Sequence, residues 1–326
     1  MKKITYPLSF KIKYYLVFHF TTHFLSKENT LFMKNISVED FKITKPISLK
    51  DVSTSLDLEA SEKKKEKELN KLRENLSEHQ DIMYAHNKYS VLICLQGMDT
   101  AGKDSLIREV FKEFNPRGVV VHSFKTPSTL ELQHDYLWRH VVALPQRGKY
   151  GVFNRTHYEN VLVTRVHPGY ILGENIPGIN SVDDITVDFW EKRFEQINNF
   201  EKQISDNGTI IFKFFLHLGK EEQRQRLLRR LNKAKHNWKF SPGDLKERDR
   251  WDDYQKCYEE AINKTSKPHA PWYIIPSDNK ETARVLVAKI IYEQMKKMKD
   301  IQEPELDEAI KENIEMYKDI LSKEVK

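Results

Sequence analysis

Two glycines and a lysine follow a short apolar stretch at residues 91–95. The run at residues 97–105, Gly-Met-Asp-Thr-Ala-Gly-Lys-Asp-Ser, contains Gly97, Ala101, Gly102 and Lys103. Glycines five positions apart let the backbone fold around an anion with its N–H groups pointing inward, and Lys103 adds a positive charge where a helix would begin. We therefore predict a phosphate-binding loop between a strand and a helix. A plain glycine turn beside a solvated lysine is the alternative, and it fits this context less well.

The loop departs from the usual pattern directly after its lysine. A Ser or Thr that holds Mg²⁺ normally stands there, whereas this chain has Asp104 and moves the hydroxyl one place, to Ser105. Asp99 and Asp104 flank Lys103 in the sequence. Because Mg²⁺ prefers oxygen ligands, we expect acids in or near the loop to bind the metal, together with an acidic element downstream.

A second polar segment follows the apolar strand predicted at residues 150–154. This strand ends in Asn154, and Arg155 and Glu159 follow it. In nucleotide kinases the corresponding strand normally ends in an Asp that organises Mg²⁺, so Glu159 and Asp99 are the carboxylates that could take over here. In the alternative interpretation, Arg155 and Glu159 are an ordinary i, i+4 pair on a helix surface.

Basic residues cluster around both loops, namely Lys125, Arg139, Arg147, Arg155 and Arg165. The planar guanidinium group suits phosphate oxygens, and a row of such groups suits a chain of phosphates better than one nucleotide tail. A further basic set shares one face of the helix predicted at residues 220–235: Arg226, Arg229, Arg230 and Lys233. Such a face is either a solvated surface or part of a lid that delivers positive charge when it closes.

Short apolar strands alternate with helical patterns along the chain. Strands are predicted at residues 91–96, 119–124, 150–154, 209–218 and 272–275, and helices at 60–86, 105–114, 183–205, 220–235, 245–264 and 281–298. This alternation favours an α/β fold with three layers and a mostly parallel sheet. Ligands of such sheets bind at the carboxyl ends of the strands, where both polar segments would lie.

Composition sets wide limits on function. The chain has 326 residues, enough for one sizeable core, and a formal net charge of +6, which suits a polyanionic ligand only if the charge is concentrated. Two distant cysteines, Cys94 and Cys257, give no disulfide framework or zinc site. His134, His140 and His157 lack partners at the spacing of metal ligands, so we expect surface or hydrogen-bonding roles.

The two ends of the chain differ from the middle. Residues 1–32 are basic and aromatic, but their apolar part is too short and too polar to span a bilayer and precedes no small-residue cleavage site. We interpret them as a disordered extension or a misassigned start and expect a cytoplasmic protein. Residues 33–300 would form the main domain, with a lid at about 220–265, and residues 301–326 a charged helical tail.

An ordered series of motifs between residues 89 and 295 resembles the polyphosphate kinase 2 family. After the loop at 97–105, these are Ser-Phe-Lys-Thr-Pro-Ser at 123–128, His-Asp-Tyr-Leu-Trp-Arg at 134–139, Phe-Asn-Arg-Thr-His-Tyr-Glu at 153–159, Arg-Val-His-Pro at 165–168 and Asn-Trp-Lys-Phe-Ser at 237–241. Asn154 is typical of the subgroup called class III, whose members act on nucleoside mono- and diphosphates. The loop departs from the family at Thr100, commonly Ala, and at Ser105, commonly Gly.

The resemblance implies a P-loop kinase fold with a helical lid, and Mg-dependent, reversible phosphoryl transfer between inorganic polyphosphate and AMP or ADP. It assigns Asp99, Lys103, Arg155 and Arg230 to catalysis, and Asp99 and Glu159 to Mg²⁺, with Mn²⁺ as a substitute. Phosphate or nucleotide binding falls to Gly97, Ala101, Gly102, Asp104, Ser105, Lys125, Asp135, Arg139, Arg165 and Lys239. ATP and guanine nucleotides are further expected ligands, and the resemblance also points to a homo-oligomer, a dimer or tetramer.

Two other functions share some of these features. An ATP-dependent P-loop kinase for a nucleotide or small molecule would have the same loop and lid, but it leaves the additional basic positions unexplained. A regulator that binds nucleotides or polyanions without turnover would not need the acids and lid arginines. No recognisable reader motif accompanies the basic residues, so specific nucleic-acid binding is not expected, and neither is a membrane partner.

Overall fold

A computed structural model describes residues 36–324 of the chain. Its single sheet has the strand order β2-β3-β1-β4-β5, and every neighbouring pair is parallel. The strands are β1 (Ser90–Gln96), β2 (Val119–Ser123), β3 (Tyr150–Asn154), β4 (Thr209–His217) and β5 (Trp272–Pro276). All five predicted strands are confirmed, and β1 lies at the centre, where the chain order reverses and ligands of such sheets bind.

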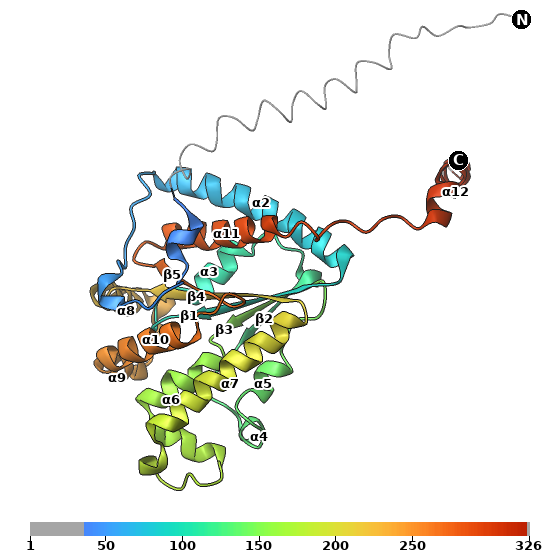
Figure 1. Ribbon diagram of the computed structural model, residues 1–326. Helices are drawn as coiled ribbons and strands as arrows, with labels where there is room; N and C mark the ends of the chain where they lie inside the picture. The colour runs from blue at the N-terminus through green and yellow to red at the C-terminus, as the bar shows by residue number, and fades with distance from the viewer. Residues whose placement is uncertain (1–35, 325–326) are drawn as a thin grey trace, which may run out of the picture.

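Helices cover both faces of this sheet. They are α2 (Glu62–His86), α3 (Lys103–Val110), α4 (Thr129–Leu132), α5 (Trp138–Val141), α6 (Val163–Val166), α7 (Val187–Asp206), α8 (Lys220–Asn232), α9 (Pro242–Asp249), α10 (Trp251–Thr265), α11 (Lys280–Lys297) and α12 (Glu308–Lys323). In Figure 1, α2, α3 and α11 lie on one side of the sheet and α6, α7 and α10 on the other. The three-layer α/β prediction is therefore confirmed.

The strand side chains alternate between the two faces of the sheet, and on the face opposite α2 the β1 residues Leu92 and Cys94 pack in a small cluster with Phe153. Val91, Ile93 and Leu95 of β1 pack in the core beneath α2, α3 and α11. On the opposite face Phe215 of β4 and Ile274 of β5 pack in a second core with residues of α7 and α10. Successive side chains of a strand point to opposite faces of the sheet, which places alternate residues in different cores. Because both faces are covered, β1 is buried along its whole length, which explains its uninterrupted apolar sequence.

The predicted single helix at residues 245–264 is wrong. The chain forms two helices there, which meet at Arg250, where φ is −90° and ψ is 17°. The physical reason lies in their surroundings. No side chain of α9 is buried, whereas α10 buries seven, including Trp251 and Tyr258. One straight helix could not follow both the exposed surface and the core.

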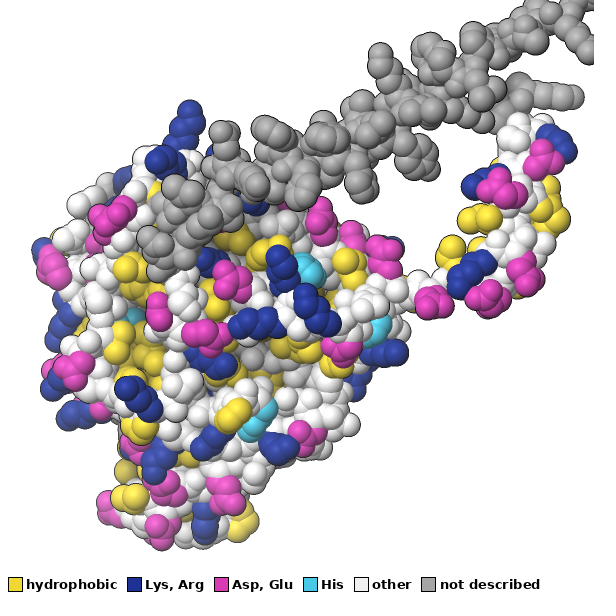
Figure 2. Space-filling view, turned by 45° about the horizontal axis from the view of Figure 1, so that its top comes forward, with side chains coloured by type: hydrophobic (Ala, Val, Ile, Leu, Met, Phe, Trp, Pro, Cys, Tyr) yellow, Lys and Arg dark blue, Asp and Glu magenta, His cyan; other side chains and the backbone are white. Residues whose placement is uncertain are grey.

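The helix α12 stands apart from the body at the end of an extended segment, as Figures 1 and 2 show. None of its residues is buried, and its exposed apolar side chains include Ile310, Ile314, Tyr317 and Leu321. No helix between residues 36 and 324 combines the length and hydropathy needed to cross a bilayer. The predicted extension at residues 1–32 lies outside the described residues, and the division into domains stays a prediction.

Candidate active site

The loop between β1 and α3 has a backbone that requires glycine at two positions. Gly97 has a φ of +152° and Gly102 a φ of +108°, values that side-chain-bearing residues rarely adopt. A Cβ atom on Gly97 would also lie 2.9 Å from the carbonyl oxygen of Leu216 on β4. The loop ends where α3 begins, at Lys103, so the unpaired N–H groups of that helix point toward the space above it.

The side chain of Lys103, the first residue of α3, points back into this loop. Its Nζ atom donates a hydrogen bond to the carbonyl oxygen of Gly97 at 2.6 Å. Burial, followed by the positive charge of Arg155, lowers the pKa of Lys103 to about 8, although the nearby carboxylates oppose the shift. An anion placed beside this ammonium group would favour its charged form.

Arg155 bridges two of the predicted acids. Its Nη2 atom lies 2.7 Å from Oδ1 of Asp99, and its Nη1 atom lies 3.5 Å from Oε2 of Glu159. Burial opposes the charge, but Glu159 and Asp99 outweigh it and raise the pKa of Arg155. The backbone of Arg155 is left-handed, with a φ of +61°, which is strained for a residue with a side chain. The strand β3 thus ends by turning a permanent cation toward the phosphate loop.

Asn154 and Ser105 have local partners. The Asn154 side chain donates to Oδ1 of Asp104 at 2.6 Å and lies 3.4 Å from Oγ of Ser123. Ser105 donates its hydroxyl hydrogen to the carbonyl oxygen of Gly102 at 2.9 Å. Asn154 therefore fixes the carboxylate of Asp104, and the Ser105 hydroxyl closes the first turn of α3.

These groups line a cleft of about 610 Å³ at the carboxyl edge of the sheet. Ten lysines and arginines and three aspartates surround it: Lys103, Arg108, Lys125, Arg155, Arg226, Arg229, Arg230, Lys239, Lys280, Arg284, Asp99, Asp104 and Asp244. The excess of cations over acids gives this cleft a strong preference for a ligand with several negative charges. The modest net charge of the chain is therefore concentrated where the sequence places the phosphate loop.

The arginines of α8 have different surroundings. Arg230 of α8 contacts Oδ2 of Asp244 at 3.0 Å and so links α8 to α9. The sequence spacing predicted that Arg226 and Arg230 lie on one exposed helix face, and this is wrong for Arg226. It is buried and donates to the carbonyl oxygens of Thr100 at 2.9 Å and Ala101 at 3.1 Å. Arg226 thus fixes the back of the phosphate loop.

Three predicted binding residues lie away from this cleft. Asp135 and Arg139 border a smaller hollow beside Glu174, and Arg139 donates to the carbonyl oxygen of Lys125 at 2.8 Å. Arg165 pairs with Glu260 of α10. The structure brings the other predicted residues together: Gly97 and Ala101 form the loop backbone, Glu159 holds Arg155, and the rest line the cleft.

Sequence reasoning missed four residues that line the cleft, namely Arg108, Asp244, Lys280 and Arg284. Lys280 opens α11 directly after β5, so its position at the carboxyl end of a predicted strand was a usable signal. Burial lowers the pKa of Lys280, and the charges of Arg226, Arg229 and Arg284 add to this effect. Such mutual repulsion among cations is relieved when an anion binds between them.

The predicted histidines contribute no metal centre. Between residues 36 and 324 no group of three or more His, Cys, Asp or Glu side chains is arranged to hold a metal ion. His140 and His157 are buried, so of the two expected roles the surface position is wrong for both and hydrogen bonding is the one left. His157 lies 3.1 Å from Glu201, whereas neither ring nitrogen of His140 has a hydrogen-bond partner.

The acids of the cleft suit a magnesium ion that is shared with phosphate. Mg²⁺ usually takes only one or two carboxylates from the protein and completes its shell with water and phosphate oxygens. Burial raises the pKa of Asp244, and the negative charge of Asp99 raises it further. These two carboxylates therefore repel each other across the cleft, and a divalent cation beside Asp99 would relieve that repulsion.

Known proteins share this sequence and fold. A family model described as polyphosphate kinase 2 matches residues 59–303. The chain is 49% identical to an ADP-polyphosphate phosphotransferase of Rhodopseudomonas palustris, over 69% of this chain and 77% of that protein. It is 44% identical to an AMP/ADP-polyphosphate phosphotransferase of Meiothermus ruber, over 69% and 78% respectively. The crystal structure of polyphosphate kinase 2 from Arthrobacter aurescens superposes with a TM-score of 0.76 at 31% identity, covering 86% of this chain and 96% of that one.

Proposed function

This chain belongs to the polyphosphate kinase 2 family, and on that basis we propose that it transfers phosphoryl groups between inorganic polyphosphate and nucleotides. The observation that carries the proposal is the cleft itself. It joins a phosphate loop to ten cationic side chains. A substrate with many phosphates can pair with several of these cations at once, whereas a single nucleotide tail offers fewer phosphates to share among them.

The arrangement supplies what phosphoryl transfer requires of a protein. The nucleotide phosphate oxygen attacks the terminal phosphorus of polyphosphate, the terminal P–O–P bond breaks, and the shortened polyphosphate keeps the bonding electrons. The transition state is loose and in line, so the protein mainly aligns the reactants and balances negative charge. Lys103 and the N-terminus of α3 hold phosphate oxygens. Arg155 and Arg230 place charge on the transferring group from β3 and from the lid.

Asp99 and Glu159 have two tasks in this scheme. Both fix the guanidinium group of Arg155, and both are the carboxylates that we expect to hold Mg²⁺. The bound ion would neutralise phosphate charge, and Mn²⁺ has the same preference for oxygen ligands. We further propose that nucleoside mono- and diphosphates, including guanine nucleotides, are substrates, that the protein is a cytoplasmic homo-oligomer and that residues 220–265 act as its lid.

The test is synthesis of ADP from AMP, and of ATP from ADP, with long-chain polyphosphate and Mg²⁺ but without added ATP. We expect both products from the wild-type protein and neither from Lys103→Ala. Product with ATP as the only donor, and none with polyphosphate, would instead identify an ATP-dependent kinase. Binding of nucleotide or polyphosphate without any product would identify a regulator.

A further inference from the structure

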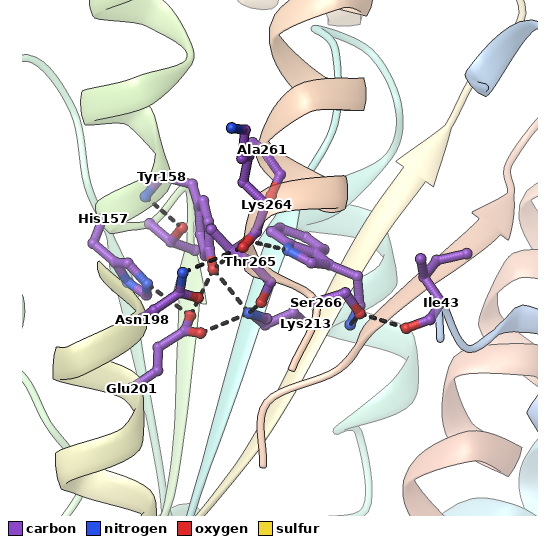
Figure 3. Close-up of polar contacts among 12 residues, drawn as sticks. Ile43, His157, Tyr158, Asn198, Glu201, Lys213, Ala261, Lys264, Thr265 and Ser266 are labelled. Carbon is purple, nitrogen blue, oxygen red and sulfur yellow. Dashed lines mark hydrogen bonds and ion pairs between the residues drawn. The ribbon is translucent and has the colours of Figure 1, made fainter. Parts of the chain in front are cut away.

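A buried ionic network lies outside the cleft, between β4, α7, α10 and the segment after β3. Lys213 of β4 and Glu201 of α7 form an ion pair of 2.6 Å, and both side chains are 0% exposed. Nζ of Lys213 also donates to the hydroxyl of Tyr158 and to the carbonyl oxygen of Thr265, each at 2.8 Å. Figure 3 shows these groups converging from β4, α7, α10 and the segment after β3.

His157 and Tyr158 connect this network to the segment that carries Arg155 and Glu159. Oε1 of Glu201 lies 3.1 Å from Nε2 of His157 and accepts a hydrogen bond from the Tyr158 hydroxyl at 2.8 Å. His157 and Tyr158 stand between Arg155 and Glu159 in the sequence, on the 3₁₀ turn His157–Val161. Besides Lys213, the two side chains that contact Glu201 therefore belong to the backbone segment that carries Arg155 and Glu159.

The turn at Arg155 needs such an anchor. Its left-handed backbone is strained, and a strained turn persists only where its surroundings hold it. Glu159 reaches Arg155 over 3.5 Å, so a small rotation of the turn would separate the two groups. Because transition-state charge is stabilised only at short range, a shift of about 1 Å can cost about 100-fold in rate.

Stability alone is a poor explanation for the network. A buried ion pair contributes little net free energy, since the cost of removing two charges from water offsets their attraction. Burial raises the pKa of Glu201, but Lys213 and His157 together outweigh it, so the pKa ends below its usual value and the carboxylate stays charged. A buried pair of this kind can instead fix one conformation.

We propose that the Glu201–Lys213 pair is a positioning device for catalysis, acting through His157 and Tyr158 to hold Arg155 and Glu159 in their productive places. The kinetic part of this inference rests on the proposed function. The pair does not touch substrate. Its effect on the reaction passes entirely through the turn that bears Arg155.

The experiment compares Tyr158→Phe with Trp272→Phe. The first variant removes the hydroxyl that links Glu201 and Lys213 to the turn. The second removes only the Trp272 indole donor, which contacts Oγ1 of Thr265 at 2.9 Å, and keeps an aromatic ring beside Tyr158 and the hydroxyl of Tyr158 itself. We expect Tyr158→Phe to lower kcat by about 10- to 100-fold with KM unchanged, and Trp272→Phe to lower the unfolding temperature without lowering kcat.

A double-variant cycle separates positioning from plain structural support. In an Arg155→Lys background the group that the network positions is already altered, so adding Tyr158→Phe should lower kcat by less than about threefold. Amide exchange in residues 155–162 should accelerate in Tyr158→Phe and stay unchanged in Trp272→Phe. Glu201→Met with Lys213→Met removes the anchor without leaving a lone buried charge and should reproduce both effects.

Two results would overturn the inference. In the first, Tyr158→Phe lowers kcat by the same factor in the Arg155→Lys background as in the wild-type protein. In the second, amide exchange at residues 155–162 is unchanged both in Tyr158→Phe and in the double variant Glu201→Met, Lys213→Met. A wild-type protein without polyphosphate-dependent product would refute the proposed function instead. Amide exchange would then still decide whether the buried pair fixes the turn.

Discussion

Lys103 is a charge of the candidate active site that we expect to respond to pH. Burial and the neighbouring Arg155 lower its pKa to about 8, so the ammonium group is present below that pH and lost above it. If the charge binds phosphate, kcat/KM, which reflects the free enzyme, should fall as pH rises through about 8. We expect Lys103→Arg to be less active but to show a flat profile from about pH 7 to about pH 9.5, because arginine stays charged. A wild-type profile without an alkaline fall would contradict this assignment.

Arg155 offers two donors in one plane, and lysine cannot reproduce that geometry. It is held by Asp99 at 2.7 Å and Glu159 at 3.5 Å. We expect Arg155→Ala to lower kcat by about 10³-fold or more. The Arg155→Lys variant should keep only part of the wild-type kcat. Formation of ATP from ADP and polyphosphate measures both. Arg224→Ala is the matched control, since Arg224 is exposed and pairs only locally with Glu221. Equal activity of Arg155→Ala and the control would exclude the catalytic role.

At the scale of elements, the turn from β1 into α3 depends on the absence of a side chain at Gly97. A Cβ atom there would meet backbone on β4 at 2.9 Å, and its φ of +152° disfavours any other residue. We expect Gly97→Ala to lower the free energy of unfolding by about 1–3 kcal/mol and to reduce phosphate binding. Urea denaturation measures the first effect and calorimetric titration with polyphosphate the second.

Gly169→Ala is the control for this substitution. Gly169 has an ordinary φ, and a Cβ atom added to it would have no heavy atom within 4 Å. The substitution should therefore change the free energy of unfolding by less than about 0.5 kcal/mol. Equal losses in both variants would mean that the loop tolerates a side chain at Gly97.

Charge in the cleft is a property of the whole molecule, because it comes from α3, α8, α11 and the segments after β2, β3 and α8 together. Binding of a polyanion to ten cations releases counter-ions and is therefore weakened by salt. We expect KM for long-chain polyphosphate to rise more steeply with NaCl than KM for ADP. In the double variant Lys280→Ala, Arg284→Ala, KM for polyphosphate should rise less steeply with NaCl than in the wild-type protein. In Arg224→Ala the rise should be unchanged. Equal slopes for both substrates would argue against polyphosphate as the occupant of this cleft.

The tail helix α12 is separate from this body. Since none of its side chains is buried, removal of residues 303–326 should shift the unfolding temperature by less than about 2 °C and leave kcat unchanged. Differential scanning calorimetry of the full-length and shortened chains gives the comparison. A clear drop in the unfolding temperature would show that α12 packs against a second copy in solution.

The sequence by itself determined the strands, the phosphate loop and the two polar segments that meet at the cleft. Local rules govern these features: apolar runs become buried strands, and glycines at residues 97 and 102 permit a backbone that other residues avoid. Family motifs such as the segment at 153–159 added the activity. The order of residues alone could thus predict that Asp99, Lys103 and Arg155 lie together in one cleft.

Only the tertiary structure decided which distant cations share the cleft and which role each arginine takes there. Arg284 reaches the cleft from α11, while Arg226 is buried at its wall and holds the loop, and helical spacing cannot distinguish such roles. The break at Arg250 and the link from Glu201 to Lys213 also depend on neighbours far along the chain. Burial, ion pairing and close approach arise from packing between elements, so local sequence patterns cannot specify them.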